Sequence, residues 1–515
     1  MRGDEERQRG VWLWFDWSIL LVVAGLYCYW SWTPQLVGFG GDNASYALMA
    51  QAYSPYPHPL NLAAQYFTGR SQFPPLYPML LALVDGGYQL RVGHLATTAC
   101  LLLAGLVMRR WALRLGLPRG LQIVLILAFL CLPGTYRQTL SLHSENLYLL
   151  ALLWFLSETS GRDAPAWDSF RVAVAATIPA LVRSAGVALV VTYCLGLLWR
   201  RPARWGRALL EVLLPLVVWN LYTAMPGNHY ANSLRLPTGA PLFDSLQVRA
   251  VTQLSALHEG WLQNMSDSGA MNVSADALGA VCLVGAAWRL WRGHADGLYV
   301  AAYLMLLVVW PFPAEATRFM FVLIPVLFVQ GTWLVYHLGT QQKWTRYAGV
   351  AGMLVPLVAI LIALPDLGLT LQRFRAPLPA ALETFRRDPN FVAGAYPDAL
   401  AYLQFSKALV ESYSAIAAVV PKGECVWSIK PTLVGYYAGR RALAPPRAEL
   451  GDEDFDIALR QGGCRYLLML NVVSPTYGVP FYPLQRVKDR ITIHWSSLRQ
   501  ADDQGPMLAL IGELR

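Results

Sequence analysis

Residues 172–199 read VAVAATIPALVRSAGVALVVTYCLGLLW, and the number of times this apolar stretch crosses the bilayer decides the topology of the whole chain. One membrane span needs about 20 apolar residues, so the stretch fits either one crossing or two short ones. A single crossing would put the arginine clusters at 109–119 and 200–207 on opposite faces of the membrane. The positive-inside rule favours both clusters on the cytoplasmic face. We therefore predict two short crossings that turn near Arg183.

The composition indicates the class of protein around this stretch. Of the 515 residues, 55% are hydrophobic and only 14% are charged, whereas a soluble domain carries about 25% charged residues. A soluble enzyme is therefore excluded, and the apolar segments exclude a disordered protein. The net charge of +9 comes from basic residues in short loops beside apolar segments, which topology explains without nucleic acid. We predict a multi-pass protein of the inner (plasma) membrane.

The apolar segments predict an α-helical polytopic protein of about eleven transmembrane helices, with the N-terminus in the cytoplasm and the C-terminus outside. The first segment, 11–32, has no small-residue cleavage site after it, so we expect an uncleaved span rather than a signal peptide. The others are the two halves of 172–199 and the segments 92–108, 120–133, 146–157, 206–224, 276–291, 297–312, 318–337 and 347–365.

Two regions are expected outside the membrane module of residues 1–366. The long loops 33–74 and 225–275 fall on the outer face, where Trp261, His229 and Tyr230 of the second loop could stack on a sugar. From 373 to 515 the apolar runs become short, which predicts a small extracytoplasmic α/β domain. Its strands are expected at CVWSIK (425–430), LVGYYAG (433–439) and CRYLLML (464–470), and its helices at 396–419 and 453–461.

Two cysteines of this outer domain, Cys425 and Cys464, could form a disulfide if the compartment oxidises thiols. The sequence leaves their pairing open.

Two carboxylates are expected near the outer membrane surface. Asp42 lies in the first loop, GFGGDNASYALMAQAY (38–53), before a segment that looks helical from Ala44 to Tyr53. Glu145 lies where the fourth span begins. An ionised group at this depth is costly unless it is paired or used. The structural alternatives are a helix cap for Asp42 and a favourable helix dipole for Glu145.

The cations on the same face are few, and each runs against the positive-inside rule. Arg318 opens a span in PFPAEATRF (311–319), where its charge is unfavourable with the helix dipole unless an anion lies beside it. Glu315 could be that anion, and Arg70 and Arg183 could reach lipid phosphate instead. Together, however, two carboxylates and several arginines on one face indicate transfer of a group from an anionic lipid carrier.

The sequence resembles the GT-C glycosyltransferases, membrane enzymes that take a sugar from a polyprenyl-phosphate carrier, such as protein O-mannosyltransferases and lipid A aminoarabinose transferases. The resemblance covers about residues 1–365, and the C-terminal stretch is similar in style to the outer domain of many members. It rests on Gly41-Asp42-Asn43 through Tyr46 and Ala50, Phe73-Pro74-Pro75-Leu76-Tyr77-Pro78, Ser144-Glu145, Val182-Arg183-Ser184-Ala185-Gly186, and Thr317-Arg318-Phe319 leading to Pro325.

The resemblance implies a polyprenyl-phosphate-linked sugar donor and a glycan, lipid or protein acceptor at the outer face. Asp42 would be the catalytic carboxylate, with Asn43 in place of the Glu that many members have. We expect Asp42 to be the general base of an inverting transfer. Glu145 would orient the acceptor or share a divalent cation with Asp42; the sequence neither requires nor rules out a metal.

The remaining candidate residues bind substrate. Arg318, Arg183 and Arg70 are candidates for the donor phosphate, with Arg70 standing in for a basic residue that is missing before the paired prolines. Tyr46, Tyr77 and His143 are candidate substrate-binding residues, although a lone histidine such as His143 is more often structural.

Two other functions remain open at this stage. A lipid flippase or transporter would place its binding residues near the bilayer midplane and often contain inverted repeats. A non-catalytic envelope assembly protein would use its outer domain for binding. Neither would depend on the charge of Asp42.

Overall fold

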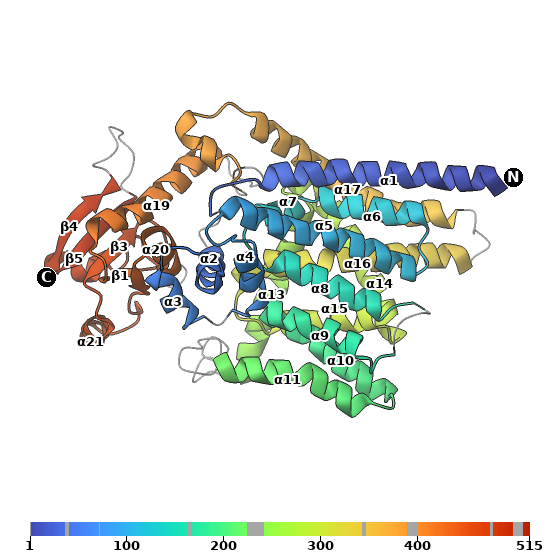
Figure 1. Cartoon of the computed structure of the whole chain (residues 1–515), viewed down its shortest axis with the longest axis horizontal. Coiled ribbons are helices and arrows are strands. Elements are labelled where there is room, and N and C mark those ends of the chain that lie inside the picture. Colours follow the sequence, from blue (N-terminus) through green and yellow to red (C-terminus); the bar gives the residue numbers. More distant parts are fainter. Residues whose placement is uncertain are drawn as a thin grey trace.

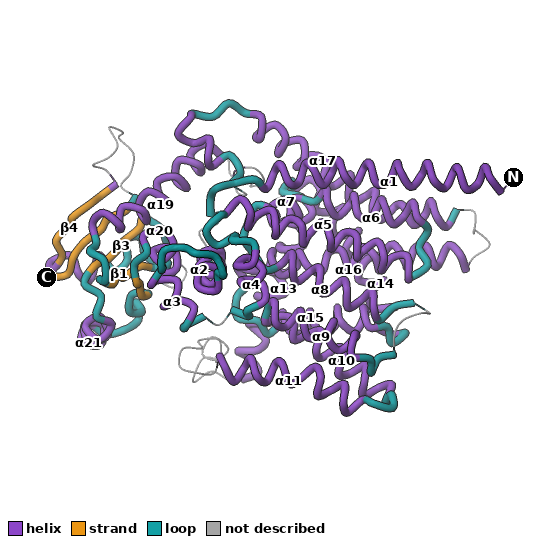
Figure 2. Tube along the Cα trace, viewed as in Figure 1, coloured by secondary structure: helices purple, strands orange, loops and turns teal. Residues whose placement is uncertain are grey.

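The fold is a bundle of long helices with a small sheet domain at one end. A computed structural model of the chain describes residues 2–36, 41–71, 73–161, 166–223, 242–341, 347–388, 391, 399–473, 477–497 and 508–515. Figure 1 shows the bundle axes running along the long dimension of the molecule, with the N-terminus at the end remote from the sheet domain. In Figure 2 the strands gather at the C-terminal end, and the remainder of the described chain is mostly helical.

The bundle contains a helix at each of the predicted membrane segments. These helices are α1 (Arg2–Ser31), α5 (Leu90–Arg114), α6 (Arg119–Cys131), α8 (Glu145–Glu158), α9 (Phe170–Val182), α10 (Val187–Arg200), α11 (Trp205–Thr223), α14 (Asn272–Trp291), α15 (Ala295–Val308), α16 (Ala316–Gln341) and α17 (Ala348–Arg375).

Fewer of these helices are long enough to cross a membrane unaided. Four described helical segments are long and apolar enough: Leu90–Arg114, Gly269–Trp291, Pro313–Gln341 and Ala348–Arg375. A fifth span results if α6 and the following α7 (Pro133–Thr139), bent by 68°, are counted together. The helical membrane architecture is thus confirmed, and the number of eleven crossings stays a prediction.

The predicted break at Arg183 is confirmed. α9 ends at Val182, the short helix η1 (Ser184–Gly186) makes the turn, and α10 follows. The two helices are antiparallel, because Trp167, just before α9, lies against Gly196 near the end of α10. Gly186 permits the turn, since a Cβ there would lie 2.3 Å from the backbone of Pro179 and Ala180.

Several helices present apolar side chains to the outside of the bundle. On α11, Leu210, Leu214 and Leu221 are more than 60% exposed. Exposed apolar surface of this extent is unfavourable in water, whereas contact with lipid acyl chains is favourable. The exposed leucines therefore agree with the membrane location that the composition predicts.

The predicted outer loops contain helices of their own. The first holds α2 (Asp42–Tyr53) and α3 (Leu62–Thr68), and α4 (Leu76–Leu83) starts directly after Pro75. The second holds α13 (Leu242–Met265) and the short η2 (Gly269–Met271).

Trp261, the one expected sugar-stacking ring of the second outer loop that lies in the described part of the chain, does not face a ligand. Trp261 is buried within the bundle, and its indole donates a hydrogen bond of 3.0 Å to the carbonyl of Ala275. Its role is packing, which corrects the expectation for that ring. His229 and Tyr230 lie outside the described residues.

The C-terminal domain is built on a five-stranded mixed sheet in the order β2-β1-β3-β5-β4. β1 is parallel to β2 and β3, and β5 is antiparallel to β3 and β4. The strands are β1 (Cys425–Ser428), β2 (Arg441–Leu443), β3 (Tyr466–Leu470), β4 (Ile491–Ser496) and β5 (Ala509–Leu514). The helices and turns before and within this domain are η4 (Ala380–Phe385), α19 (Ala399–Val419), α20 (Pro431–Ala438), α21 (Asp452–Gly462), α22 (Leu484–Val487) and η5 (Lys488–Arg490).

One predicted strand of this domain is wrong. The run LVGYYAG (433–439) is α20, not a strand. Pro431 occupies the first turn of α20, a position where proline is compatible with a helix. Gly435 lies against Phe67 of α3, so tertiary packing on the outer loop helices favours the helical form. The period of so short an apolar run does not distinguish helix from strand.

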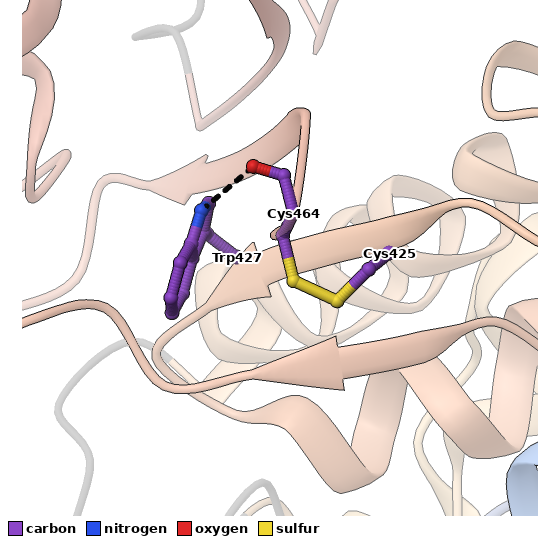
Figure 3. Close-up of a disulfide and its surroundings, with 3 residues drawn as sticks. All are labelled: Cys425, Trp427 and Cys464. Atoms are coloured by element: carbon purple, nitrogen blue, oxygen red, sulfur yellow. Dashed lines mark hydrogen bonds between the residues drawn. A yellow bond between two sulfur atoms is a disulfide. The ribbon is translucent and has the colours of Figure 1, made fainter. Parts of the chain in front are cut away.

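The two cysteines that the sequence left open are joined in the structure. Cys425 at the start of β1 and Cys464 just before β3 form a disulfide with Cα atoms 4.4 Å apart. Figure 3 shows Trp427 beside the bond, where its indole donates a hydrogen bond of 2.9 Å to the carbonyl of Cys464. The disulfide links the neighbouring parallel strands β1 and β3. The chain continues from β1 into α20.

Candidate active site

Arg318 is the centre of a charge cluster that joins three distant parts of the chain. It lies in the first turn of α16 and is 17% exposed. Its Nε donates to Glu145 Oε1 at 2.7 Å, and its Nη1 donates to Asp42 Oδ2 at 2.8 Å and to Glu315 Oε2 at 2.6 Å. Three carboxylates thus offset a cation at a helix N-terminus, where the helix dipole alone would disfavour it.

Glu145 is the buried anchor of this cluster. Its side chain is fully buried at the start of α8, where Oε1 also pairs with Arg183. Arg183 comes from the turn between α9 and α10, and its guanidinium lies 4.9 Å from the ring centre of Phe319. One carboxylate therefore holds two guanidinium groups from separate parts of the chain, and the buried charges are paired as burial requires.

Asp42 supplies a partly exposed carboxylate. It is the first residue of α2 and is 33% exposed, while Gly41 occupies the N-cap position. The carboxylate accepts from Arg318 and caps no helix, so the capping alternative for Asp42 is wrong. The expected ion pair between Glu315 and Arg318 is present as well.

These charges open onto a pocket of about 210 Å³. Asp42, Arg183, Arg318 and Glu315 line it, whereas the fully buried Glu145 lies behind the guanidinium groups. In Figure 1, α2 lies between the bundle and the C-terminal domain, at the end of the bundle nearest the sheet. The aromatic walls are Tyr46, Phe73, Trp310, Phe312 and Phe319. A negatively charged head group with an apolar or ring-shaped neighbour fits such a lining.

The candidate substrate residues lie at different depths. Tyr46 lines the pocket and shares a 2.9 Å hydrogen bond with Ser144. Tyr77 is buried behind it, edge-on to the Tyr46 ring with centroids 4.9 Å apart, and hydrogen-bonds Thr97. Tyr77 therefore supports Tyr46 and is not part of the lining.

His143 lies half-buried in the loop before α8. Burial, followed by the charge of Arg318, lowers the pKa of His143 to about 3. The imidazole is therefore neutral at physiological pH and suited to hydrogen bonding rather than to charge pairing with a phosphate.

Arg70 lies apart from the cluster. Its guanidinium stacks on Tyr66 of α3, 4.5 Å from the ring centre, and it does not belong to the lining of the pocket. The structure thus brings together Asp42, Glu145, Arg183 and Arg318, but not Arg70.

A divalent cation does not fit between Asp42 and Glu145. Arg318 donates to both carboxylates, and Arg183 pairs with Glu145 as well. A metal ion there would face two fixed guanidinium groups at close range, and like charges repel strongly in a partly buried site. Among the described residues no group of three or more His, Cys, Asp or Glu side chains is placed to hold a metal. The arginines themselves supply positive charge for a phosphate.

Buried polar atoms near the cluster lack protein partners. Within the described part of the chain, no hydrogen-bond partner is found for the amide of Asn43, for Nδ1 of His143 or for Oε2 of Glu145. Native proteins leave few such atoms unpaired, and those that remain often mark places where water or a ligand binds. They therefore agree with a polar ligand at this site.

The sequence did not identify the aromatic walls at Trp310 and Phe312. They come from the segment WPFP (310–313), directly before Glu315 and Arg318. Aromatic residues beside prolines at the end of an apolar segment were available as a signal, but rings at a membrane interface are usually anchors.

The helical core and the outer domain together match known structures. Apo ArnT from Cupriavidus metallidurans aligns over 98% of both chains with a TM-score of 0.51 and 10% identity. The chain has the fold of ArnT. The structure of the same ArnT bound to undecaprenyl phosphate aligns over 97% of this chain and 98% of that one, with a TM-score of 0.50 and 12% identity.

A third solved structure is less similar to the chain, and the two sequence comparisons found no match. The oligosaccharyltransferase of Archaeoglobus fulgidus aligns over 89% of this chain and 69% of its own, at 13% identity and a TM-score of 0.49. No protein-family model matches the sequence, and no curated protein is significantly similar to it. At these identities the ArnT alignments establish the fold alone.

Proposed function

We propose that the protein is a membrane glycosyltransferase that moves a sugar from a polyprenyl-phosphate donor to a glycan, lipid or protein acceptor on the outer face of the plasma membrane. The observation that carries the proposal is the pocket lined by Asp42, Arg318 and Arg183, in which Arg318 donates to the Asp42 carboxylate. A base and two cations in one pocket on a GT-C fold match the chemistry of this transfer. One solved structure with the fold, that of ArnT, contains undecaprenyl phosphate.

The bonds made and broken in the proposed sugar transfer define the role of Asp42. The acceptor hydroxyl attacks the anomeric carbon, the bond from that carbon to the phosphate oxygen breaks, and its electron pair leaves with the phosphate. Asp42 takes the hydroxyl proton, a contribution of about 10²- to 10⁴-fold. Inversion at the anomeric carbon follows from this single displacement.

The arginines stabilise the leaving phosphate. Its negative charge grows as the glycosidic bond breaks, so fixed guanidinium groups stabilise the transition state more than the ground state. Arg318 Nη1 is shared between Asp42 and Glu315. A donor phosphate would replace these partners, which frees Asp42 to accept a proton. Nε stays on Glu145, so the guanidinium keeps its position.

The location of the pocket favours an enzyme over a flippase. The charged residues gather at the end of the bundle next to the C-terminal domain, and a transporter would place them near the midplane. In the proposed topology the sheet domain is extracytoplasmic, so the sugar is presented outside while the prenyl tail stays in the bilayer.

The experiment compares Asp42→Asn with Glu315→Gln, because both carboxylates accept from the same nitrogen of Arg318. Cells that lack the protein receive the wild type or either variant, and mass spectrometry follows the envelope glycans and lipids. We expect one sugar modification to be lost without the protein and restored by the wild type and by Glu315→Gln. Purified Asp42→Asn should be folded and at least about 10²-fold slower. A fully active Asp42→Asn variant would exclude this carboxylate as the base, and an unchanged sugar profile in all cells would overturn the proposed transfer.

A further inference from the structure

A second, larger pocket lies at the other end of α10 from the candidate active site. Its volume is about 750 Å³, and it lies between the ends of α9 and α10 on one side and the α14–α15 turn on the other. α10 spans 14 residues from Val187, near Arg183, to Arg200, or about 21 Å of helix. In Figure 1 this end of the bundle is remote from the C-terminal domain.

The aromatic wall of this second pocket is held in place by close packing. Trp167 is buried, and a Cβ at Gly196 would lie 2.1 Å from its ring. The ring stacks on Tyr193 with planes 10° apart. The Tyr193 hydroxyl donates a 2.8 Å hydrogen bond to the carbonyl of Trp167. The wall is therefore part of the folded core and exists before any ligand binds.

Two arginines give the pocket a positive charge. Arg200 stacks on Trp167 at 4.4 Å, and its Nη2 reaches across to the carbonyl of Gly293 at 3.4 Å. Arg292 stacks on Trp291 at 5.4 Å. No Asp or Glu of the described chain lines the pocket, and none lies within ion-pair distance of either arginine.

The two acids next to lining residues in the sequence already have partners: Asp168 accepts from the backbone N–H of Arg204 at 3.0 Å. Asp296 is buried and pairs with the buried Arg289, and its Oδ1 accepts from the backbone of Gly297. The charge of Asp296 is therefore used within the turn, and the positive charge of the pocket is left for a ligand.

The mouth of the pocket faces the surroundings of the bundle through apolar side chains. Trp199 is 85% exposed and Trp291 75%. Val191, Leu195 and Leu198 continue this exposed apolar stripe along α10 toward the middle of the bundle. A ligand that fits must therefore combine an anionic head with apolar chains.

We propose that this pocket binds the phosphate head group of an anionic glycerophospholipid. The phosphate lies between Arg200 and Arg292, and the acyl chains follow the stripe on α10. Guanidinium groups match phosphate oxygens in geometry and charge. The pocket lies at the opposite end of α10 from the catalytic cluster and needs no sugar donor, so this inference stands apart from the proposed function.

The experiment places a photoreactive side chain at the mouth of the pocket. Full-length protein carrying Trp199→p-benzoylphenylalanine is reconstituted in vesicles of phosphatidylcholine with phosphatidylglycerol as the minor lipid. After irradiation, mass spectrometry identifies the lipid adduct. We expect phosphatidylglycerol to be enriched about tenfold over its share of the vesicle, because two arginines attract it. The same label at Leu210, which is exposed on α11, should show little enrichment.

Charge variants identify the source of the enrichment. Arg200→Gln with Arg292→Gln should abolish it, whereas Arg204→Gln with Arg207→Gln, which removes the same charge outside the pocket lining, should leave it unchanged. Equal adducts at Trp199 and Leu210 would overturn the proposal even if the double variant failed to fold. Enrichment that survives loss of Arg200 and Arg292, or that millimolar inorganic phosphate abolishes, would overturn it as well.

Discussion

The two ends of α8 carry the same arrangement of charges in different surroundings. Glu145 begins the helix and Glu158 ends it, and both side chains are fully buried. Glu145 pairs with Arg183 and Arg318. Glu158 pairs with Arg171 at 2.8 Å and lies within 3.2 Å of Arg110 and 3.8 Å of Arg114.

The two clusters differ in the surroundings of the arginines that pair with Glu145 and with Glu158. Arg183 and Arg318 are mostly buried and line a pocket together with the partly exposed Asp42. The side chains of Arg110 and Arg171, at the other end, are about half exposed at 47% and 54%. A buried glutamate with arginines is therefore not by itself a sign of catalysis. We infer that the Glu145 cluster serves chemistry and the Glu158 cluster serves folding and topology.

The largest expected effect comes from Arg318. Arg318→Gln removes the cation that joins three carboxylates, so the donor phosphate loses a stabilising donor. We expect kcat/KM to fall about 10²- to 10³-fold, measured on purified enzyme with its polyprenyl-phosphate donor. Arg171→Gln is the matched change at the other end, and it should leave kcat/KM within about threefold. Equal losses in both variants would remove the functional distinction between the two ends.

Glu145→Gln should have the next largest effect, since this residue acts by positioning. The amide is nearly isosteric, but it no longer neutralises Arg183 and Arg318. We expect kcat/KM to fall about tenfold to a hundredfold, with a raised KM for the donor because the guanidinium groups are less fixed. Glu145→Asp keeps the charge and should recover part of the activity. A drop in thermal stability with unchanged kinetics would instead assign Glu145 a structural role.

Glu158→Gln should show the opposite pattern. The variant leaves three arginines without a buried partner, which we expect to lower the free energy of unfolding by about 1–3 kcal/mol. The activity per folded molecule should be unchanged. Stability is measured by heating the protein and recording the fraction that still elutes as folded protein in size-exclusion chromatography. Activity per folded molecule is measured as donor turnover by that fraction. A loss of turnover larger than that of Glu145→Gln would reverse the comparison.

The smallest effect is expected at Arg70. Its guanidinium stacks on Tyr66 outside the pocket, so Arg70→Gln should change kcat/KM by less than about threefold. A direct assay beside Arg318→Gln provides the test. A hundredfold loss would mean that Arg70 reaches the donor phosphate when substrate is bound.

The sequence predicted the features that follow from the distribution of charged residues and from the pattern of apolar segments. The positive-inside rule predicted the break at Arg183, because it favours the arginine clusters at 109–119 and 200–207 on the same face of the membrane. The topology predicted from that break places Asp42, Glu145 and Arg318 at the same membrane surface. In the structure they form one cluster.

The remaining features depend on tertiary contacts that no local pattern encodes. The run at 433–439 has no readable period and becomes helical by packing on the first outer loop. Glu158 looks like an ordinary acid at a helix end, and only the fold brings three arginines to it. Arg70 lies close to the paired prolines in sequence, yet the ring of Tyr66 holds it away from the pocket.

The contact between the outer domain and the first loop has a practical consequence. The hydroxyl of Thr432 in α20 donates a 3.1 Å hydrogen bond to the carbonyl of Gly41, the residue before Asp42. Gly41 has a φ of 96°, a conformation that other residues adopt only with strain. Chimaeras that graft another protein's ectodomain onto this bundle would therefore need the first loop transplanted with it, since loop and ectodomain form one interlocking unit.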